Sequence, residues 1–288
     1  MQTLQEMERK LKSADDLHTV VRTMKSLAAV NIRQYEHAAR SLEEYFRSVE
    51  MGLRAALSTR PLIGHRRSPL KTLIIVFGSD QGMAGRFNES IIEYLQDSLD
   101  DTVERENQLY WVAGAKALGL VEDAVGHINQ QFELPTSAEV ISSRVQEMLL
   151  SLAALREEQG ELRLTLFHNR PSRRSSYSQT QVNLLPPDHT WLEGLGGRRW
   201  PGRQVPFYTL PWEELFRSLI SEYLFVALFR AFATTMAAEN AARLASMQRA
   251  EKNIEETMDE LKLKYHSMRQ NTISEELFDV ISGFEALS

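Results

Sequence analysis

Residues 212–288 read WEELFRSLISEYLFVALFRAFATTMAAENAARLASMQRAEKNIEETMDELKLKYHSMRQNTISEELFDVISGFEALS, with no proline and one glycine, Gly283. Residues 1–60 also lack proline and hold one glycine, Gly52, whereas every proline of the chain lies between Pro61 and Pro211. Proline removes a backbone donor and clashes with the preceding helical turn, and glycine costs about 1 kcal/mol relative to alanine inside a helix. The two ends are therefore predicted to form very long helices, roughly 110 Å and 80 Å at about 1.5 Å per residue.

The apolar residues of the C-terminal helix recur in steps of three and four, which is the signature of a coiled-coil seam. Pro211 precedes this helix, and Glu213 and Glu214 occupy its first turn, where negative charge complements the helix dipole. The predicted seam comprises Phe216, Leu219, Tyr223, Val226, Phe229, Ala233, Met236, Asn240, Leu244, Met247, Ile254, Met258, Leu261, Tyr265 and Met268.

Residues 3–58 are predicted to form one helix with the same spacing. Asn31 interrupts its apolar series, and there it either sets the register as a buried polar residue or faces solvent. A single folded segment between the two helices makes antiparallel pairing the economical arrangement. The predicted seam comprises Leu4, Met7, Leu11, Ala14, Leu17, Val21, Met24, Ala28, Tyr35, Ala38, Leu42, Tyr45, Val49 and Leu53.

The middle of the chain alternates strand and helix. Residues 72–77, TLIIVF, form a continuous apolar run of the kind that a buried parallel strand shows. Such an alternation predicts a small, Rossmann-like α/β domain with a mostly parallel sheet. The further strands are expected at 109–113, 128–134, 162–167 and 181–185, and the helices at 88–99 and 137–158.

The predicted fold class is therefore α/β with a long antiparallel α-helical coiled coil, whose terminal helices flank the small domain. Residues 1–60 are expected to form the N-terminal coiled-coil helix and residues 211–288 the C-terminal one. Residues 61–210 are expected to form the α/β domain, with an irregular link at 186–206 that is rich in proline and glycine.

The composition excludes several classes of function. The formal net charge of −6 argues against a nucleic-acid-binding protein, which would show a basic face. Arginine pairs at 66–67, 173–174 and 198–199 are expected to be solvated loop charge. The absence of cysteine excludes disulfides and thiolate zinc sites.

No segment of the chain is predicted to enter a membrane. The N-terminus is too polar for a secretion signal. The most apolar stretch, residues 223–238, is short for a membrane span and contains Arg230. We therefore expect a soluble, cytoplasmic protein that can attach to a membrane complex through partners.

The strongest candidate for a chemical site is the turn GSDQGMAG at residues 78–85. A glycine-rich turn between strand and helix can bind phosphate, but this spacing fits neither the P-loop nor the dinucleotide fingerprint, so a structural turn is favoured. The seven histidines show no metal-binding spacing, and the adjacent pairs Asp15-Asp16 and Glu255-Glu256 point in different directions. We predict no catalytic residue, cofactor site or metal site.

Three segments of the chain resemble a known family. TVVRTMKSLAAVNIRQYE at residues 19–36 is similar to the N-terminal helix signature of the F-type ATP synthase gamma subunit, and residues 239–287 resemble its C-terminal signature over an ungapped stretch. The turn at residues 79–85 is similar to the first strand-to-helix turn of that family. Departures from the usual family residues, such as His266 and Ser274, indicate a divergent member, with the alternate sodium-linked branch as one interpretation.

The resemblance implies a rotor shaft without catalytic activity or cofactor. The terminal helices would run through a hexamer of alpha and beta subunits in a 3:3:1 complex, and the α/β domain would form a foot against the epsilon subunit and the c ring. Rotation would couple ion translocation to ATP synthesis or hydrolysis, with catalysis in alpha and beta. The chain would be peripheral, at the cytoplasmic face of the cell membrane, held there only through the complex.

The resemblance also assigns a beta-subunit contact to particular positions. Arg269 and Gln270 match the pair that hydrogen-bonds a loop of beta, and residues 281–287 match an apolar tip that either sits in a bearing at the top of the hexamer or caps the helix. The full set of contact residues is Met24, Lys25, Arg269, Gln270, Ile273, Ser274 and Glu276.

Two other functions remain open on the sequence. One is an α/β nucleotide-binding enzyme that oligomerises through helical arms and binds its ligand at residues 78–85. The other is a structural coiled-coil tether with no role in energy conversion. Calorimetry with nucleotides addresses the first, and association with ATP synthase subunits addresses the second.

Overall fold

The computed structural model describes residues 3–60, 71–99, 107–172, 176–197, 200, 202 and 207–285. The arginine pairs at 66–67, 173–174 and 198–199 lie outside these residues. The chain divides into two compact units, which we call the coil unit (Met1–Ala29 with Arg243–Ser288) and the sheet unit (Val30–Ala242). The helices α1 (Leu4–Ser41) and α7 (Trp212–Glu285) contribute residues to both units.

A five-stranded sheet forms the centre of the sheet unit, in the order β3-β2-β1-β4-β5. The strand β1 pairs in parallel with β2 and β4, and β2 pairs in parallel with β3. Only the edge strand β5 is antiparallel, to β4, so the prediction of a mostly parallel sheet is confirmed. The strands are β1 (Thr72–Phe77), β2 (Gln108–Ala113), β3 (Gln130–Phe132), β4 (Arg163–Pro171) and β5 (Tyr177–Leu185).

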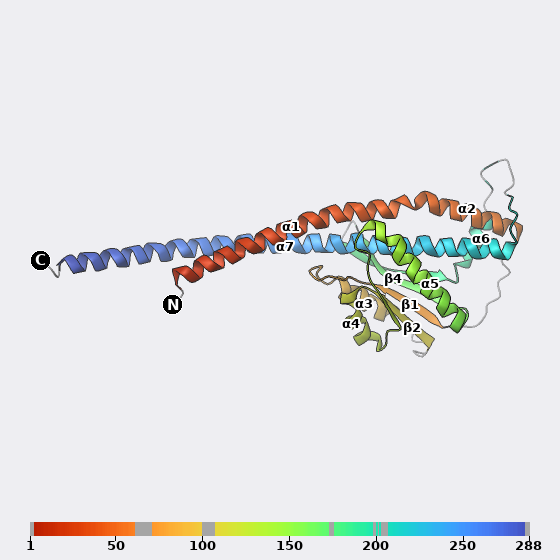
Figure 1. Ribbon diagram of the computed structural model, residues 1–288, viewed down its shortest axis with the longest axis horizontal. Coiled ribbons are helices and arrows are strands. Elements are labelled where there is room, and N and C mark those ends of the chain that lie inside the picture. Colours follow the sequence, from red (N-terminus) through yellow and green to blue (C-terminus); the bar gives the residue numbers. More distant parts are fainter. Residues whose placement is uncertain are drawn as a thin grey trace. The chain divides into compact units, whose positions relative to one another are not determined.

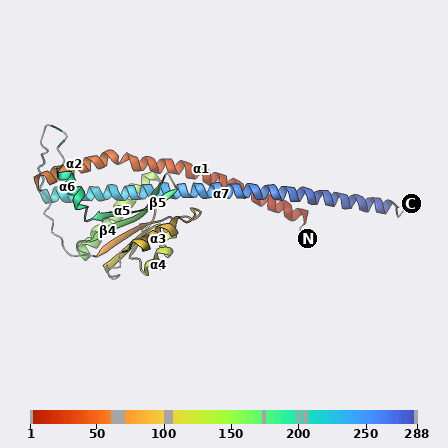
Figure 2. The same ribbon diagram turned by 180° about the vertical axis from the view of Figure 1, so that it is seen from behind.

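Helices cover both faces of this sheet. All six side chains of β1 are buried, because alternate residues point to opposite faces and both faces are covered. Ile74 and Val76 pack against α3 (Phe87–Ser98) and α4 (Ala115–Val125), which Figure 2 shows on the side of the sheet away from α7. The helix α4 was not predicted from the sequence, which indicated no element between the strands expected at 109–113 and 128–134.

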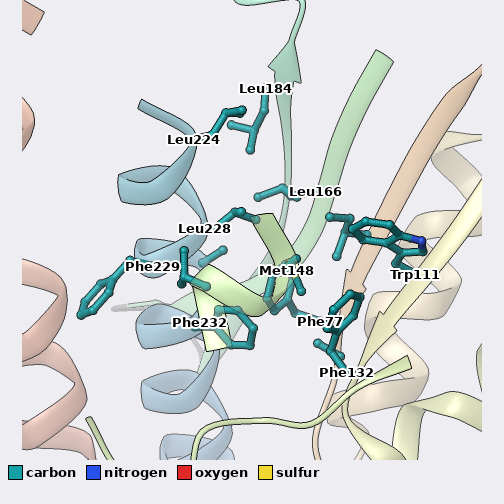
Figure 3. Close-up of a cluster of buried hydrophobic side chains, with 14 of the residues drawn as sticks. Phe77, Trp111, Phe132, Met148, Leu166, Leu184, Leu224, Leu228, Phe229 and Phe232 are labelled. Carbon is teal, nitrogen blue, oxygen red and sulfur yellow. The ribbon is translucent and has the colours of Figure 1, made fainter. Parts of the chain in front are cut away.

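The opposite face of the sheet packs against α5 (Ile141–Gln159) and α7, as Figure 1 shows. A short 3-10 turn, Ala138–Val140, precedes α5. Phe77 of β1 meets Phe232 of α7 edge to face, with ring centroids 4.9 Å apart. Figure 3 shows that these rings join Trp111, Phe132 and Met148 in one apolar layer. The C-terminal helix therefore forms part of the core of the sheet unit.

Two predicted element boundaries are wrong. The N-terminal helix breaks at Leu42 and continues as α2 (Glu43–Thr59), next to Ser41, whose hydroxyl donates to the carbonyl of Ala38. The link at 186–206 is not irregular throughout, because it contains α6 (His189–Gly197), which buries apolar residues against α2. The division into three domains stays a prediction.

Within the sheet unit α7 runs antiparallel to α1 and α2. Asn31 forms a hydrogen bond with Asn240 at 3.3 Å, and the Tyr45 hydroxyl donates to Glu222 at 2.6 Å. Residues further along the N-terminal helices therefore pair with earlier residues of α7, as antiparallel helices do. Tyr45 is 42% exposed, so its predicted place inside the seam is wrong. It reaches Glu222 from the edge of the helix pair.

One window of α7 has the length and apolar composition of a membrane span, with a mean hydropathy of 1.4. Half of this window is buried inside the protein. The helix packs Leu228, Phe232 and Ala237 into the core of the sheet unit. A core helix passes the same composition test, so the apolar character of α7 is accounted for by this packing.

Candidate partner-contact surface

All seven residues that the resemblance assigned to a partner contact lie in the coil unit, on α1 or α7. Met24 and Lys25 are half-buried on α1. The other five are exposed along two turns of α7: Arg269, Gln270, Ile273, Ser274 and Glu276. The structure therefore separates the set into two residues beside the helix seam and five on an open helix surface.

Polar side chains join α1 and α7 across the seam of the coil unit. The Tyr265 hydroxyl donates to Glu8 at 2.8 Å, and Lys25 forms an ion pair with Glu251. Here too, the later residue of α1 pairs with the earlier residue of α7. The predicted antiparallel coiled coil is therefore confirmed in this unit, and Lys25 has a structural role in it.

The Lys25–Glu251 pair belongs to a larger cluster of charges. The hydrogen bond from Lys25 is the main reason that the pKa of the Glu251 carboxyl lies below its usual range, and the charge of Arg22 acts in the same direction. His18 lies 3.4 Å from Glu255 on the next turn of α7. Glu251 thus already has a cationic partner in Lys25, and Glu255 has His18 as a hydrogen-bond partner.

This cluster also has the geometry of a possible metal site. One ligand atom from each of His18, Glu251 and Glu255 lies within 4.8 Å of the others. A divalent cation would have to displace the ammonium group of Lys25 from Glu251. We therefore interpret the cluster as an ion-pair network that joins the two helices.

The end of α7 has no described neighbour in the coil unit. From Arg269 to Ser282 every side chain whose burial the structure describes is exposed. Four exposed apolar side chains of this segment form what we call the tip stripe, Ile273, Leu277, Val280 and Ile281, at helical spacing on one side. The exposed ring of Phe278 lies outside this stripe, about 100° around the helix from Leu277. A contiguous exposed apolar surface of this kind marks a site of protein contact.

The predicted contact residues are divided around the tip stripe. At 100° per residue, Arg269 and Glu276 lie about 40° and 60° from Ile273 in one direction around the helix. Gln270 and Ser274 lie about 60° and 100° from it in the other direction, and the Ser274 hydroxyl donates to the carbonyl of Gln270 at 2.9 Å. This surface therefore combines an apolar centre with an exposed guanidinium and an exposed carboxylate, and it suits a partner with both apolar and charged groups.

A second exposed apolar surface lies on α1. Leu17, Val20 and Leu27 are each more than half exposed and lie on one side of the helix. Leu17 is 57% exposed, so its predicted place in the seam is wrong. At 100° per residue Met24 lies between Leu17 and Val20 on this surface, and it is half-buried.

The glycine-rich turn at residues 78–85 has a structural explanation. Ser79 donates its backbone N–H to Asn88, and the carboxylate of Asp80 accepts from the backbone N–H groups of Ala115 and Leu134. A Cβ at Gly78 would lie 2.2 Å from the Cβ of Ala117. These contacts hold β1 close to α3 and α4, as the favoured interpretation of the turn requires.

Sequence reasoning missed the residues that bridge the helices. Glu8 and Glu251 were not singled out, because single charged residues on a helix are ordinarily solvated, and His18 was considered only as a metal ligand. Their positions could have identified them. His18 and Glu8 each follow a predicted seam residue. Glu251 lies one helical turn from the predicted seam residues Met247 and Ile254. Only the pairing register of α1 and α7 shows which charge meets which.

Comparison with known proteins gives consistent results over the whole chain. The family model for ATP synthase matches residues 3–287. The ATP synthase gamma chain of Syntrophus aciditrophicus is 26% identical over 305 aligned residues, which cover 100% of this chain and 99% of the relative. The ATP synthase gamma chain of Lachnoclostridium phytofermentans is 24% identical over 299 aligned residues, which cover 100% of both chains.

Solved structures agree in fold. The chain superposes on one from the rotor of the Euglena gracilis mitochondrial ATP synthase with a TM-score of 0.67 and 16% identity, covering 94% of this chain and 98% of that one. A chain of the central stalk and c-ring structure of the Tetrahymena thermophila enzyme gives a TM-score of 0.59 at 16% identity, with coverage of 80% and 99%. At this identity the likeness establishes the arrangement of helices and strands.

Proposed function

The chain belongs to the gamma-chain family of the ATP synthases, and from this premise we propose that it is the central rotor shaft of an F-type complex. It transmits torque between a membrane c ring and a catalytic hexamer of alpha and beta subunits, in a 3:3:1 complex. The foot contacts the c ring and the epsilon subunit. The chain itself is not catalytic, and it lies at the cytoplasmic face of the cell membrane through the complex alone.

The exposed end of α7 is the observation that carries this proposal. Over the described residues from Arg269 onward, no part of the chain covers the tip stripe. Burying these four side chains against a partner is favourable by about 25 cal/mol for each Å² of apolar surface removed from water. Arg269 and Glu276 flank the stripe and supply charged groups for recognition.

The mechanism follows from differential contact. A rotating asymmetric helix pair presents a different side to each of three beta subunits in turn. A partner shifts a conformational equilibrium only by the difference in its binding free energy for the two states. The side carrying Arg269 and Ile273 therefore biases one beta subunit at a time, and hydrolysis drives the same cycle in reverse.

Helix continuity makes the transmission possible. The helix α7 runs for 74 residues without a break, and its Lys25–Glu251 and Glu8–Tyr265 links resist slippage against α1. A proline or a glycine pair in such a helix would introduce a kink. The scarcity of both residues at the two ends of the chain is thereby explained.

Assembly tests the proposal directly. The chain is co-expressed with the alpha and beta subunits of its own source, and native mass spectrometry measures the stoichiometry of the particles. We expect a 3:3:1 complex that is weakened by L277D in the tip stripe but not by L150D, which changes an even more exposed leucine on α5. Hexamers that never retain the chain would refute the shaft role.

The nucleotide-binding alternative predicts a different result. Calorimetry of the isolated full chain with ATP, ADP and NAD would detect binding at residues 78–85. We expect none, because the described polar groups of Asp80 and Asn88 are engaged by backbone groups. Measurable nucleotide affinity would support the nucleotide-binding enzyme instead.

A further inference from the structure

A groove runs between α5 and the first turns of α7 in the sheet unit. Its volume is about 410 Å³, within the range of small-molecule sites. Its walls are mainly apolar, and the largest side chains are Leu149, Leu152, Trp212, Phe216, Ile220 and Leu224. This groove has no part in the proposed contact with the hexamer, which uses the coil unit.

The groove is lined by two arginines and one glutamate, so positive charge is in excess. Arg156 of α5 and Arg217 of α7 line it on opposite walls, and neither guanidinium has an acceptor among the described residues. The third charged lining residue, Glu213, is already paired with Arg60. A hydrogen bond to its own backbone N–H and then the one from Arg60 lower the pKa of the Glu213 carboxyl. The groove therefore offers an apolar interior and two available cations.

We propose that this groove binds a single long-chain carboxylate, with the alkyl chain between α5 and α7 and the head group between Arg156 and Arg217. Guanidinium groups match the geometry of a carboxylate and bind it with two parallel hydrogen bonds. With the head group at Arg217, the lining on α7 extends about 10 Å along the helix to Leu224, the same length as the lining on α5. The part of the alkyl chain next to the head group lies along these two walls.

The dimensions favour a lipid over a partner helix. On α5 the lining extends only from Leu149 to Arg156, about two helical turns. A stable protein interface buries about 800 Å² on each partner, far more than this short wall supplies. A slender ligand with one charged end fits both the narrow wall and the paired arginines.

Equilibrium dialysis of the full-length chain with palmitate, below its critical micelle concentration, tests the proposal. A153W places an indole in the groove, and A154W puts the same indole on the neighbouring, non-lining position of α5. Both alanines are exposed, so both variants should fold. We expect A153W to bind palmitate at least about tenfold more weakly and A154W to bind like the wild type. Equal affinity in all three proteins would overturn the proposal.

The head group is tested with R156Q and R217Q, against R163Q as a charge-matched control outside the groove. Each groove variant should weaken palmitate binding about tenfold or more, because it removes a charge-assisted hydrogen bond. Hexadecanol should bind more weakly than palmitate. Equal binding of the alcohol, or an unchanged affinity in both groove variants, would exclude recognition of a carboxylate.

Two further results would also overturn the proposal. One is binding to vesicles of anionic phospholipid without binding of free palmitate, since that would indicate a membrane surface. The other is failure of A153W, but not A154W, to assemble with the remaining ATP synthase subunits while its palmitate affinity is unchanged, since that would indicate a protein partner. The dialysis uses the chain alone, so its outcome is independent of the rotor function.

Discussion

Asn31 on α1 donates a hydrogen bond from its side-chain amide to the side-chain oxygen of Asn240 on α7, at 3.3 Å. Asn240 is 2% exposed, and its own amide donates to the carbonyl of Met236 at 2.8 Å. Both asparagines were predicted at seam positions. A buried polar pair inside an apolar seam favours one register, because a shifted register leaves its groups unpaired.

We expect N31L to destabilise the protein by about 1–3 kcal/mol, because the buried Asn240 oxygen loses its donor. The double variant N31L/N240L should recover part of this loss, since both polar groups are then gone. Urea unfolding followed by circular dichroism measures both changes. N253L, on an exposed position of α7, is the control. An N31L protein as stable as the wild type would show that the bond does not contribute.

Replacement of Lys25 by methionine should raise the pKa of Glu251. The Lys25 hydrogen bond holds this pKa below its unfolded value, so its stabilising effect is present above the unfolded pKa and is lost as the pH falls through the folded one. NMR titration of the side-chain carboxyl carbons measures the shift. K252M removes an exposed lysine that pairs with Glu256, and it should leave Glu251 unchanged. No shift in K25M would contradict the ion pair.

His168 should make the sheet unit less stable in mild acid. Burial lowers its pKa to about 4, so the unfolded chain takes up a proton that the folded chain does not. Stability is full above the unfolded pKa of about 6.5 and falls by up to about 3 kcal/mol as the pH drops to about 4. Unfolding of H168Q across this range should show a weaker dependence. H127Q, at an exposed histidine, should behave like the wild type.

M247P should disrupt α7 by about 3 kcal/mol or more, because proline removes a hydrogen bond and clashes with the preceding turn. Met247 is buried in the coil unit, so M247L is the control for the side chain and should cost less than about 1.5 kcal/mol. Circular dichroism measures the helix, and a rotation assay on the assembled complex measures torque. Normal torque in M247P would contradict the need for an unbroken helix.

R269A should impair coupled ATP synthesis and leave the folded chain intact. Arg269 is exposed, and such a substitution changes stability by about 0.5 kcal/mol or less. Synthesis in reconstituted vesicles is compared with that of K262A, which removes an exposed lysine paired with Asp259 on the same helix. Equal rates in wild type and R269A would remove this residue from the proposed contact.

The periodic parts of the fold were predictable, and the parts that depend on packing were not. The strand at residues 72–77 and the start of α7 after Pro211 follow from local patterns, and the structure has both. The helix α6 was missed, because Leu192 and Leu195 signal a helix only once α2 lies against them. The exposure of Leu17 depends on how far the seam rotates around α1, which spacing alone does not specify.

The same division applies to the contact surface. The resemblance selected seven residues, and only the structure shows that they differ in environment. Lys25 forms an ion pair between α1 and α7, whereas Arg269 is exposed on the surface of α7.

The sequence by itself determined two long terminal helices and an α/β centre, because the residues that break helices and the pattern that forms strands act over a few neighbouring positions. The tertiary structure decided which asparagine, lysine and glutamate meet, and which apolar side chains remain uncovered. These outcomes depend on the relative rotation and register of segments more than 200 residues apart in the chain. No short-range pattern carries that information.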